Sequence, residues 1–387
     1  MPERKWYPGT GANPFHIVLM GLEGLKRIPM PMVVLLLLAY GGALAAALPQ
    51  PDWFVAAWSV GVLFDAAVLV ALPHFKRSFG PPVPGLILLA VLRWIVAGVL
   101  GSLVLPLGSN LAIGLNALAQ ANGILLIYYG LWLEPQRLTL TRQRLVSPKL
   151  PQGNTLRVLH LGDIHMERWT PREEKLLAKL GELAPDVVLF SGDLLNISYT
   201  HDPLAQAEVV RLLNLLRAPL GVYAVVGSPA VDLPEIACAI YNRTPHIRWL
   251  QDEAACLPGH NLAILGINCT QNPAKDGPNL RKVASRLIGD PFKLLLYHTP
   301  DLAPEASRAG IDLQFSGHTH GGQVRLPWYG ALTAGSIYGK RFEMGRYQLG
   351  KMVLYVTRGI GMEGLGIPRI RVLCPPEITL WELRGAA

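Results

Sequence analysis

The sequence predicts a protein of two parts, an amino-terminal membrane region of four helices followed by a layered α/β domain. The chain has 387 residues, which exceeds one typical domain. It is 51% hydrophobic and only 16% charged, more apolar than an average soluble protein. Nearly all of the apolar excess lies before residue 134, and from residue 156 short apolar runs end in polar or glycine-rich turns. We therefore expect a transmembrane anchor over residues 1–133 and an α/β domain over residues 134–387.

Four apolar segments follow one another in the first part, at residues 30–48, 53–72, 86–107 and 111–133. Each has about 20 residues, enough for a helix to cross a hydrocarbon core about 30 Å thick. A cleaved signal peptide would have one shorter apolar stretch, so we expect all four segments to remain. The first and third connections are short, which predicts antiparallel helical hairpins.

The basic residues around these segments predict an orientation. They precede the first segment, lie in the second connection or follow the fourth segment, and they are Arg4, Lys5, Lys26, Arg27, Lys76, Arg77, Arg137, Arg142, Arg144 and Lys149. Because cytoplasmic loops carry an excess of Lys and Arg, we expect an integral protein of the cell (inner) membrane with both termini and the α/β domain in the cytoplasm. Residues 15–28 are expected to form either an interfacial amphipathic helix or a frayed tail.

Two charged residues, Asp65 and Arg93, fall inside the apolar segments at equal depth on consecutive helices. A lone charge at that depth is costly, so we expect an ion pair. The pair either fixes the register of the helices or belongs to a polar pocket for a lipid headgroup with Asn116, Gln120 and Asn122.

Charge and cysteine content narrow the choice of partners. The formal net charge is +8, but no run of basic residues interleaved with aromatics is present. We therefore expect anionic lipid, and no nucleic acid, as a partner. The four cysteines have no CxxC spacing and fall in the domain expected in the cytoplasm, so plain buried thiols are expected rather than disulfides or a zinc knuckle.

Strand and helix patterns alternate in the second part. Short apolar runs predict buried strands at residues 156–161, 187–190, 221–226, 262–267, 294–297 and 313–315. Helical patterns at residues 171–183 and 204–216 separate the early strands. This alternation predicts a layered α/β architecture.

Carboxylates and imidazoles follow these strands directly, at Asp163, His165, Asp193, His298, His318 and His320. Loops at strand ends are where a rigid sheet carries chemistry. The two pairs with one residue between them point two side chains the same way on an extended backbone. Carboxylate and imidazole together suit divalent ions such as Mn²⁺, Fe²⁺ or Zn²⁺. The sequence therefore predicts a metal centre.

The order Asp163-Ile164-His165, Gly192-Asp193, His298 and Gly317-His318-Thr319-His320 resembles that of the calcineurin-like metallophosphoesterases. The resemblance covers residues 134–384. The run after His320, Gly-Gly-Gln-Val-Arg-Leu-Pro, together with Arg358-Gly359-Ile360-Gly361 and Pro376-Glu377-Ile378, is similar to the membrane-associated bacterial branch of that superfamily. The resemblance implies an α-β-β-α sandwich and two divalent metal ions. It also implies a phosphorylated small-molecule or lipid-linked substrate.

Residue by residue, the resemblance implies a first metal ion held by Asp163, His165, Asp193 and His320. The second ion would be held by Asp193, which bridges, with His298 and His318. Such a pair activates water and neutralises charge at phosphorus. Arg325 is a further candidate, either as a substrate-phosphate ligand or as a structural residue of its loop.

The third motif of the family is absent. Gly227-Ser228-Pro229-Ala230 stands where the family has Gly-Asn-His-Asp. The Asn normally completes the second metal site and the His assists the leaving group, whereas Ser228 is a weak ligand and Pro229 has no proton to donate. We therefore expect the second site to be the weaker one, and no catalytic side chain is assigned.

Three interpretations follow. The chain is a membrane-anchored, metal-dependent phosphoesterase that hydrolyses a phosphodiester, phosphomonoester or pyrophosphate bond. Alternatively, it is a catalytically degenerate relative that binds a ligand or partner, or an engineered or misread version of an active enzyme. No Walker or Rossmann loop is present, so nucleotide hydrolysis through a P-loop is not supported. The sequence does not predict the oligomeric state.

Overall fold

The computed structural model describes residues 21, 24–47 and 52–386. The described chain divides into two compact units. The α/β unit takes in Pro135–Glu363 and the chain from Arg371 onward, and the helical unit takes in the chain up to Glu134 together with Gly364–Ile370. Arg4, Lys5, most of the expected interfacial stretch and the connection after the first apolar segment lie outside the described residues.

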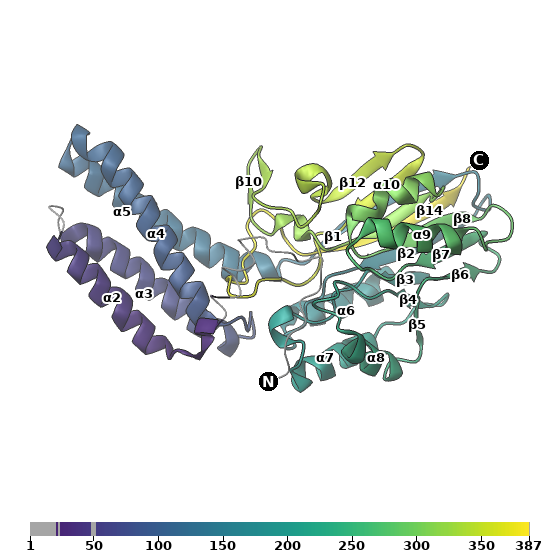
Figure 1. The fold of residues 1–387 in the computed structure, drawn as a ribbon, viewed down its shortest axis with the longest axis horizontal. Coiled ribbons are helices and arrows are strands. Elements are labelled where there is room, and N and C mark those ends of the chain that lie inside the picture. The colour runs from purple at the N-terminus through teal and green to yellow at the C-terminus, as the bar shows by residue number, and fades with distance from the viewer. Residues whose placement is uncertain (1–20, 22–23, 48–51, 387) are drawn as a thin grey trace. The chain divides into compact units, whose positions relative to one another are not determined.

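Four long helices form the helical unit (Figure 1), and they are α2 (Met30–Ala47), α3 (Asp52–His74), α4 (Pro82–Val104) and α5 (Ser109–Tyr128). α3 packs against the other three. Within the described residues, three helical spans are long and apolar enough to cross a membrane: Trp53–His74, Pro82–Val104 and Ser109–Gln136. The first expected span corresponds to α2. Only Met30–Ala43 of this helix, the part whose side chains are described, counts as apolar helix, and it is shorter than a span. The structure therefore supports three spans clearly, not four, because the described part of the first is too short.

The expected ion pair between Asp65 and Arg93 is present in the helical unit. The Arg93 guanidinium donates to both carboxylate oxygens of Asp65, at 2.7 and 2.8 Å, and both side chains are buried. Gln120 accepts a further bond from Arg93 at 3.0 Å. Asn122, in contrast, is exposed and bonds to the carbonyl of Leu118 within its own helix. A two-pronged pair of this kind satisfies charges that would otherwise be costly among apolar helices.

One segment far along the chain also belongs to the helical unit. Gly364–Ile370 packs beside the turn between α3 and α4, where a Cβ on Gly80 would lie 2.8 Å from the Arg369 side chain. The Arg369 guanidinium is buried and donates to the carbonyls of Leu365 and Ile367 at 3.1 and 3.3 Å. The polypeptide thus leaves the α/β unit after Glu363, packs with the helices, and returns at Arg371.

Two six-stranded mixed sheets form the α/β unit (Figure 1). The first has the order β1-β14-β2-β3-β4-β5. Its strands are β1 (Thr139–Ser147), β14 (Glu377–Gly385), β2 (Thr155–Leu161), β3 (Val187–Phe190), β4 (Val222–Ala224) and β5 (Ile247–Trp249). β2 to β5 are parallel, and β14 runs antiparallel to β2 while pairing parallel with β1.

The second sheet has the order β12-β13-β9-β8-β7-β6. Its strands are β12 (Gly345–Leu349), β13 (Met352–Val356), β9 (Leu313–Ser316), β8 (Phe292–Leu296), β7 (Leu262–Gly266) and β6 (Glu253–Leu257). The four inner strands are parallel and both edge strands are antiparallel. A short hairpin, β10 (Arg325–Leu326) with β11 (Gly330–Ala331), lies apart from both sheets.

The two sheets share one apolar core. Leu189 and Val158 of the first sheet and Phe315, Leu294 and Tyr355 of the second are buried in the same cluster. The outer face of the first sheet packs against α6 (Pro171–Leu183), α7 (Pro203–Leu213) and α8 (Pro234–Asn242). The outer face of the second sheet packs against α9 (Pro273–Ala284) and α10 (Ala303–Arg308). An α/β domain with mixed sheets is therefore confirmed.

Local sequence explains where these elements begin. α6 begins after Thr170, whose hydroxyl accepts from the Arg172 N–H while the Glu173 carboxylate accepts from the Thr170 N–H, a reciprocal cap. The observed helix has the predicted bounds. The predicted strands at residues 156–161, 187–190, 262–267 and 313–315 correspond to β2, β3, β7 and β9 within about two residues.

Candidate metal centre

The six predicted ligands lie together where the parallel strands end. Asp163 and His165 follow β2, Asp193 follows β3, His298 follows β8, and His318 and His320 follow β9. Parallel strands bring their carboxyl ends to one edge of a sheet, and the shared core aligns that edge of both sheets. All six residues are buried or nearly so. Two groups of possible ligand atoms result.

The first group contains Asp163, His165 and His320. The Nε2 atoms of the two imidazoles face each other at 2.8 Å. Asp163 Oδ1 accepts from the backbone N–H of His318 at 2.9 Å. Its other oxygen, Oδ2, is buried and has no hydrogen-bond partner among the described residues. A buried carboxylate oxygen without a partner is costly unless it meets a cation.

The second group contains Asp193, His298 and His318. Asp193 Oδ2 lies 3.2 Å from His298 Nε2 and also 3.5 Å from His165 Nε2, in the first group. The same carboxylate oxygen therefore faces both groups. The Ser228 hydroxyl lies among the second group, 3.0 Å from His298 Nε2 and 3.3 Å from both His318 Nδ1 and Asp193 Oδ2.

Backbone strain is concentrated at these residues. Five of the six ligands have a positive φ, namely Asp163 (50°), His165 (44°), Asp193 (58°), His318 (70°) and His320 (51°). Such conformations cost about 1–3 kcal/mol each and persist where the surroundings impose them, typically at functional sites. Close packing helps to impose them here: a Cβ on Gly227 would lie 2.1 Å from Asp193 Oδ1, and one on Gly317 would lie 2.4 Å from Asp163 Oδ2.

The charges of the site are strongly coupled. Burial disfavours the imidazolium of His298, but the Asp193 carboxylate overcomes this and raises the pKa of His298 to about 9. Burial also opposes charge on His165, whereas Glu363 raises its pKa to about 9. Burial and the nearby His298 lower the pKa of His318 to about 4. The raised pKa values of His165 and His298 favour protonated imidazoles at neutral pH, so a cation held by these two residues would compete with protons.

Three residues that the sequence did not predict as part of the site support it. Asp232 is buried, and its carboxylate accepts backbone N–H bonds from Asp193, Leu194 and Gly227 at 2.7–3.0 Å, which joins the loops after β3 and β4. Glu363 lies 2.8 Å from His165 Nδ1. A carboxylate on the far nitrogen of a ligating histidine orients the ring.

The third supporting residue, Arg371, is fully buried behind His320. Its guanidinium donates to the carbonyls of Arg358 at 2.8 Å and Gly361 at 2.5 Å, and it lies 3.4 Å from His320 Nδ1. It thereby holds the loop after β13 against the site. The sequence signal for Asp232, Glu363 and Arg371 is weak: each lies within a few residues of a motif that the sequence analysis quoted.

Other candidates have protein partners. Arg325 donates to the carbonyl of Gly321 at 2.8 Å and pairs with Glu343 at 2.9 Å, so its role as a phosphate ligand stays a prediction. Asn196 caps the turn that follows it, because its side chain accepts from the Ser198 N–H at 2.9 Å. The four cysteines are free thiols; Cys269 and Cys374 are buried, as expected, whereas Cys238 and Cys256 are exposed.

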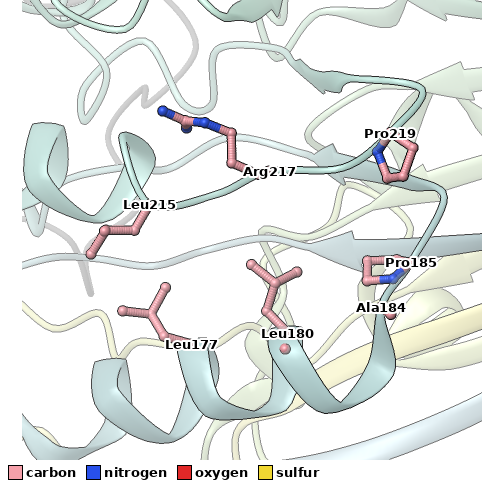
Figure 2. Close-up of a pocket in the computed structure, with 8 residues that line it drawn as sticks. Leu177, Leu180, Ala184, Pro185, Leu215, Arg217 and Pro219 are labelled. Carbon is pink, nitrogen blue, oxygen red and sulfur yellow. The ribbon is translucent and has the colours of Figure 1, made fainter.

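A cavity of about 470 Å³ lies elsewhere in the α/β unit (Figure 2). Leu177 and Leu180 of α6 form one side, and Leu215 and Arg217 the other (Figure 2). Pro185 and Pro219 precede β3 and β4, so the cavity lies at the amino ends of these strands. The metal ligands follow the carboxyl ends. The cavity is apolar and brings no group of titratable side chains together, so it is not the candidate site.

The donor set fits two divalent cations. It supplies imidazole nitrogens and carboxylate oxygens, an unpartnered buried oxygen on Asp163 and one carboxylate that faces both groups. Fold and site together define a two-sheet α/β protein with paired metal-ligand groups at the strand ends. The chain belongs to the calcineurin-like phosphoesterase family, whose model matches residues 156–322.

Relatives from several bacteria extend the match over most of their own length. The chain is 30% identical over 269 residues to the metallophosphoesterase YkuE of Bacillus subtilis (strain 168), covering 66% of this chain and 89% of YkuE. It is 28% identical over 260 residues to the phosphodiesterase YaeI of Escherichia coli (strain K12), covering 65% and 90%. It is 27% identical over 305 residues to the UDP-2,3-diacylglucosamine pyrophosphatase LpxG of Chlamydia muridarum, covering 64% and 90%.

Proposed function

We propose that the protein is a membrane-anchored, metal-dependent phosphoesterase that hydrolyses a phosphodiester, phosphomonoester or pyrophosphate bond in a lipid-linked substrate. The observation that carries the proposal is the position of Asp193, whose Oδ2 faces imidazoles of both ligand groups at 3.2 and 3.5 Å. A carboxylate shared between two divalent cations would hold them close together, and such a pair clamps both the attacking and the leaving oxygen of an in-line displacement at phosphorus.

Each ligand has a definite task in this proposal. Asp163, His165, Asp193 and His320 would hold one Mn²⁺, Fe²⁺ or Zn²⁺ ion, and Asp193, His298 and His318 the other. Bound cations would supply Lewis acidity and charge neutralisation at the phosphoryl oxygens. Ser228 Oγ lies close enough to the second group to provide a neutral oxygen there. Pro229 has no proton to give, so a leaving group would either take a proton from water or depart as a stable anion.

Two observations support a lipid-linked substrate. Three helical spans are apolar and long enough to cross a membrane, which would place the site beside a bilayer. One relative, LpxG, is a pyrophosphatase for a diacylated UDP-sugar. Tethering raises the effective concentration of an interfacial substrate without any new contact. We extend this substrate class, a lipid-borne phosphodiester or pyrophosphate, to the present chain.

The loop at Ser228 and Pro229 favours a second candidate function. Without the family's Asn and His, the chain could retain metal and phosphate binding while turnover is lost. The protein would then be a metal-dependent module that binds a phosphorylated ligand or a partner.

Turnover by the full-length protein separates the two functions. We expect hydrolysis of an aryl phosphodiester and of a diacylated nucleotide-sugar pyrophosphate in the presence of Mn²⁺. His298→Ala should abolish both activities, because it removes a ligand of the second group. His201→Ala is the matched control, because His201 is exposed and belongs to neither group. Metal binding without hydrolysis of any phosphoester would favour the binding module.

The proposed membrane topology counts α2 as a fourth span beside the three that the structure supports, with both termini and the α/β unit in the cytoplasm. A cysteine at position 288 tests it, since Ile288 is 97% exposed in the α/β unit. In cells that carry Ile288→Cys and serines at the exposed Cys238 and Cys256, an impermeant thiol reagent should label the protein only after lysis. Labelling of intact cells would overturn the orientation.

A further inference from the structure

Exposed apolar side chains gather in one segment of the α/β unit, residues 326–338. Six large ones lie there: Leu326, Trp328, Tyr329, Leu332, Ile337 and Tyr338, with exposed fractions of 36–103%. The other exposed large hydrophobic residues of this unit are scattered singly, at Val146, Leu204, Leu215, Ile288 and Leu373. Single exposed hydrophobic residues are ordinary, whereas a gathered patch marks an interaction surface.

A short hairpin fixes the backbone of this segment, and its apolar side chains are exposed to solvent. In the β10–β11 hairpin, Arg325 pairs with Ala331 and Leu326 with Gly330. Glu343 fastens the base by accepting from the Ala331 N–H at 3.1 Å and pairing with Arg325 at 2.9 Å. At the tip Trp328 has a φ of 61°, which is unusual for so bulky a residue. The indole is fully exposed despite this conformational cost.

The charges of the segment are suited to an anionic surface. Residues 326–342 contain no Asp or Glu but include the exposed Lys340 and Arg341; Lys340 also lies 3.5 Å from the carboxylate of Glu343, the residue that follows the segment. The Lys340 ammonium lies 3.3 Å from the centre of the Tyr329 ring, which joins the basic and apolar parts of the patch. Trp and Tyr with aliphatic neighbours and flanking Lys or Arg are typical of the interface between lipid headgroups and acyl chains.

The same segment reaches the metal centre. Gly335 lies against His318 of the second ligand group, because a Cβ there would be 3.5 Å from His318 Nε2. The next residue, Ser336, donates from Oγ to the Asp301 carboxylate at 2.6 Å. The segment that carries the exposed apolar side chains therefore also contains a residue, Gly335, that lines the candidate site.

We propose that residues 326–338 insert into the interfacial region of the phospholipid bilayer, with Trp328 and Ile337 among the acyl chains and Lys340 and Arg341 at anionic headgroups. A bilayer is favoured over a protein partner, because apolar helices of the same chain that cross a membrane would tether the α/β unit to that bilayer and raise its effective concentration. The inference rests on the proposed membrane anchoring. It deepens the proposed function, since a lipid substrate would expose its phosphate to the second ligand group while its tails stay in the membrane.

Depth-dependent quenching tests this insertion in the full-length protein. The protein, with Cys238→Ser and Cys256→Ser, would be placed one copy per nanodisc of phosphatidylethanolamine and phosphatidylglycerol. A polarity-sensitive fluorophore would be attached to Trp328→Cys and, separately, to Ile337→Cys, so that one misfolded variant does not decide the result. Ile288→Cys is the matched control, because Ile288 is 97% exposed in the same unit but has no apolar patch in its sequence neighbourhood.

Nitroxide-labelled lipids should quench the fluorophore at positions 328 and 337 at least severalfold more than at position 288, with a blue-shifted emission. Equal, weak quenching at all three positions would overturn the insertion. A blue shift without lipid quenching that appears only when two copies share a disc would also overturn it, in favour of self-association. Because this measurement requires no turnover, strong quenching in a protein that hydrolyses nothing would uphold the insertion while the proposed enzymatic function fails.

Discussion

The hydroxyl of Ser228 lies 3.0 Å from Nε2 of His298. His298 is one of the predicted strand-end ligands, and Ser228 stands where the resemblance to the family implies a metal-binding asparagine. The serine oxygen faces the second ligand group, although its side chain is shorter than that of asparagine. Pro229 follows it, where the resemblance implies a histidine.

Restoring the loop should raise turnover. We predict that the double variant Ser228→Asn/Pro229→His hydrolyses an aryl phosphodiester about 10²–10⁴-fold faster than the parent, the usual contribution of a positioned general acid. Both changes are made together, because Pro229 fixes φ and lacks an N–H, which constrains the loop that must accept the histidine. Ser228→Ala in the parent removes the hydroxyl that faces the second ligand group. We expect this variant to bind the second Mn²⁺ more weakly in a calorimetric titration.

The exposed residue Ser285, whose hydroxyl bonds to the Lys282 carbonyl, provides a control substitution, Ser285→Ala. It should leave metal binding unchanged. If the double variant binds two metal ions and still does not hydrolyse the substrate, the loss of function extends beyond this loop.

Metal affinity should rise with pH. The pKa values of His165 and His298 are raised to about 9, and both side chains must be neutral to act as ligands. Protons therefore compete with the metal below pH 9, and each histidine that must release one makes the apparent affinity rise up to about tenfold per pH unit. Calorimetry in two buffers of different ionisation enthalpy would count the released protons. Affinity that does not change from pH 6.5 to 8.5 would contradict these pKa values.

Asp232 should be needed for metal binding although it is not a predicted ligand. Its carboxylate accepts three backbone N–H bonds from the loops that present Asp193 and Ser228. Asp232→Ala leaves these donors buried without an acceptor, at a cost of about 1–3 kcal/mol each. We expect a lower thermal midpoint and a lower metal content.

Asp290→Ala is the matched control for Asp232→Ala, because Asp290 is an exposed carboxylate that pairs only with lysines. It should leave both readouts near the parent values. A fully metallated Asp232→Ala variant would show that the backbone of these loops holds its shape without the carboxylate.

The clustering of the six candidate ligands could be predicted from the sequence, because these residues obey a local rule. Each follows an apolar run that is recognisable as a strand, and parallel strands bring such positions together. The two ligand groups in the structure contain all six predicted residues. No local pattern reveals the residues that orient the ligands from elsewhere in the chain. Glu363 lies 198 residues beyond His165, and only the fold brings its carboxylate to the His165 ring.

The edge of the first sheet could not be predicted for the same reason. β1 pairs along its whole length, Thr139–Ser147, with β14, Glu377–Gly385, at the other end of the domain. Arg142 and Arg144 were interpreted only as basic residues that flank the last span, yet they lie on β1. Likewise, no periodicity marks Gly364–Ile370 as part of the helical unit. A chain that begins at Leu150 would lack β1 and the helices on which that segment packs.

Elemental analysis of the purified full-length protein shows whether the two ligand groups bind metal. We predict between one and two divalent transition-metal ions per chain. We also predict a sharp fall in the metal content of Asp163→Ala, which removes the unpartnered buried oxygen of the first group. Protein that is folded, metal-free and unable to bind added Mn²⁺ would show that these residues do not form a metal site.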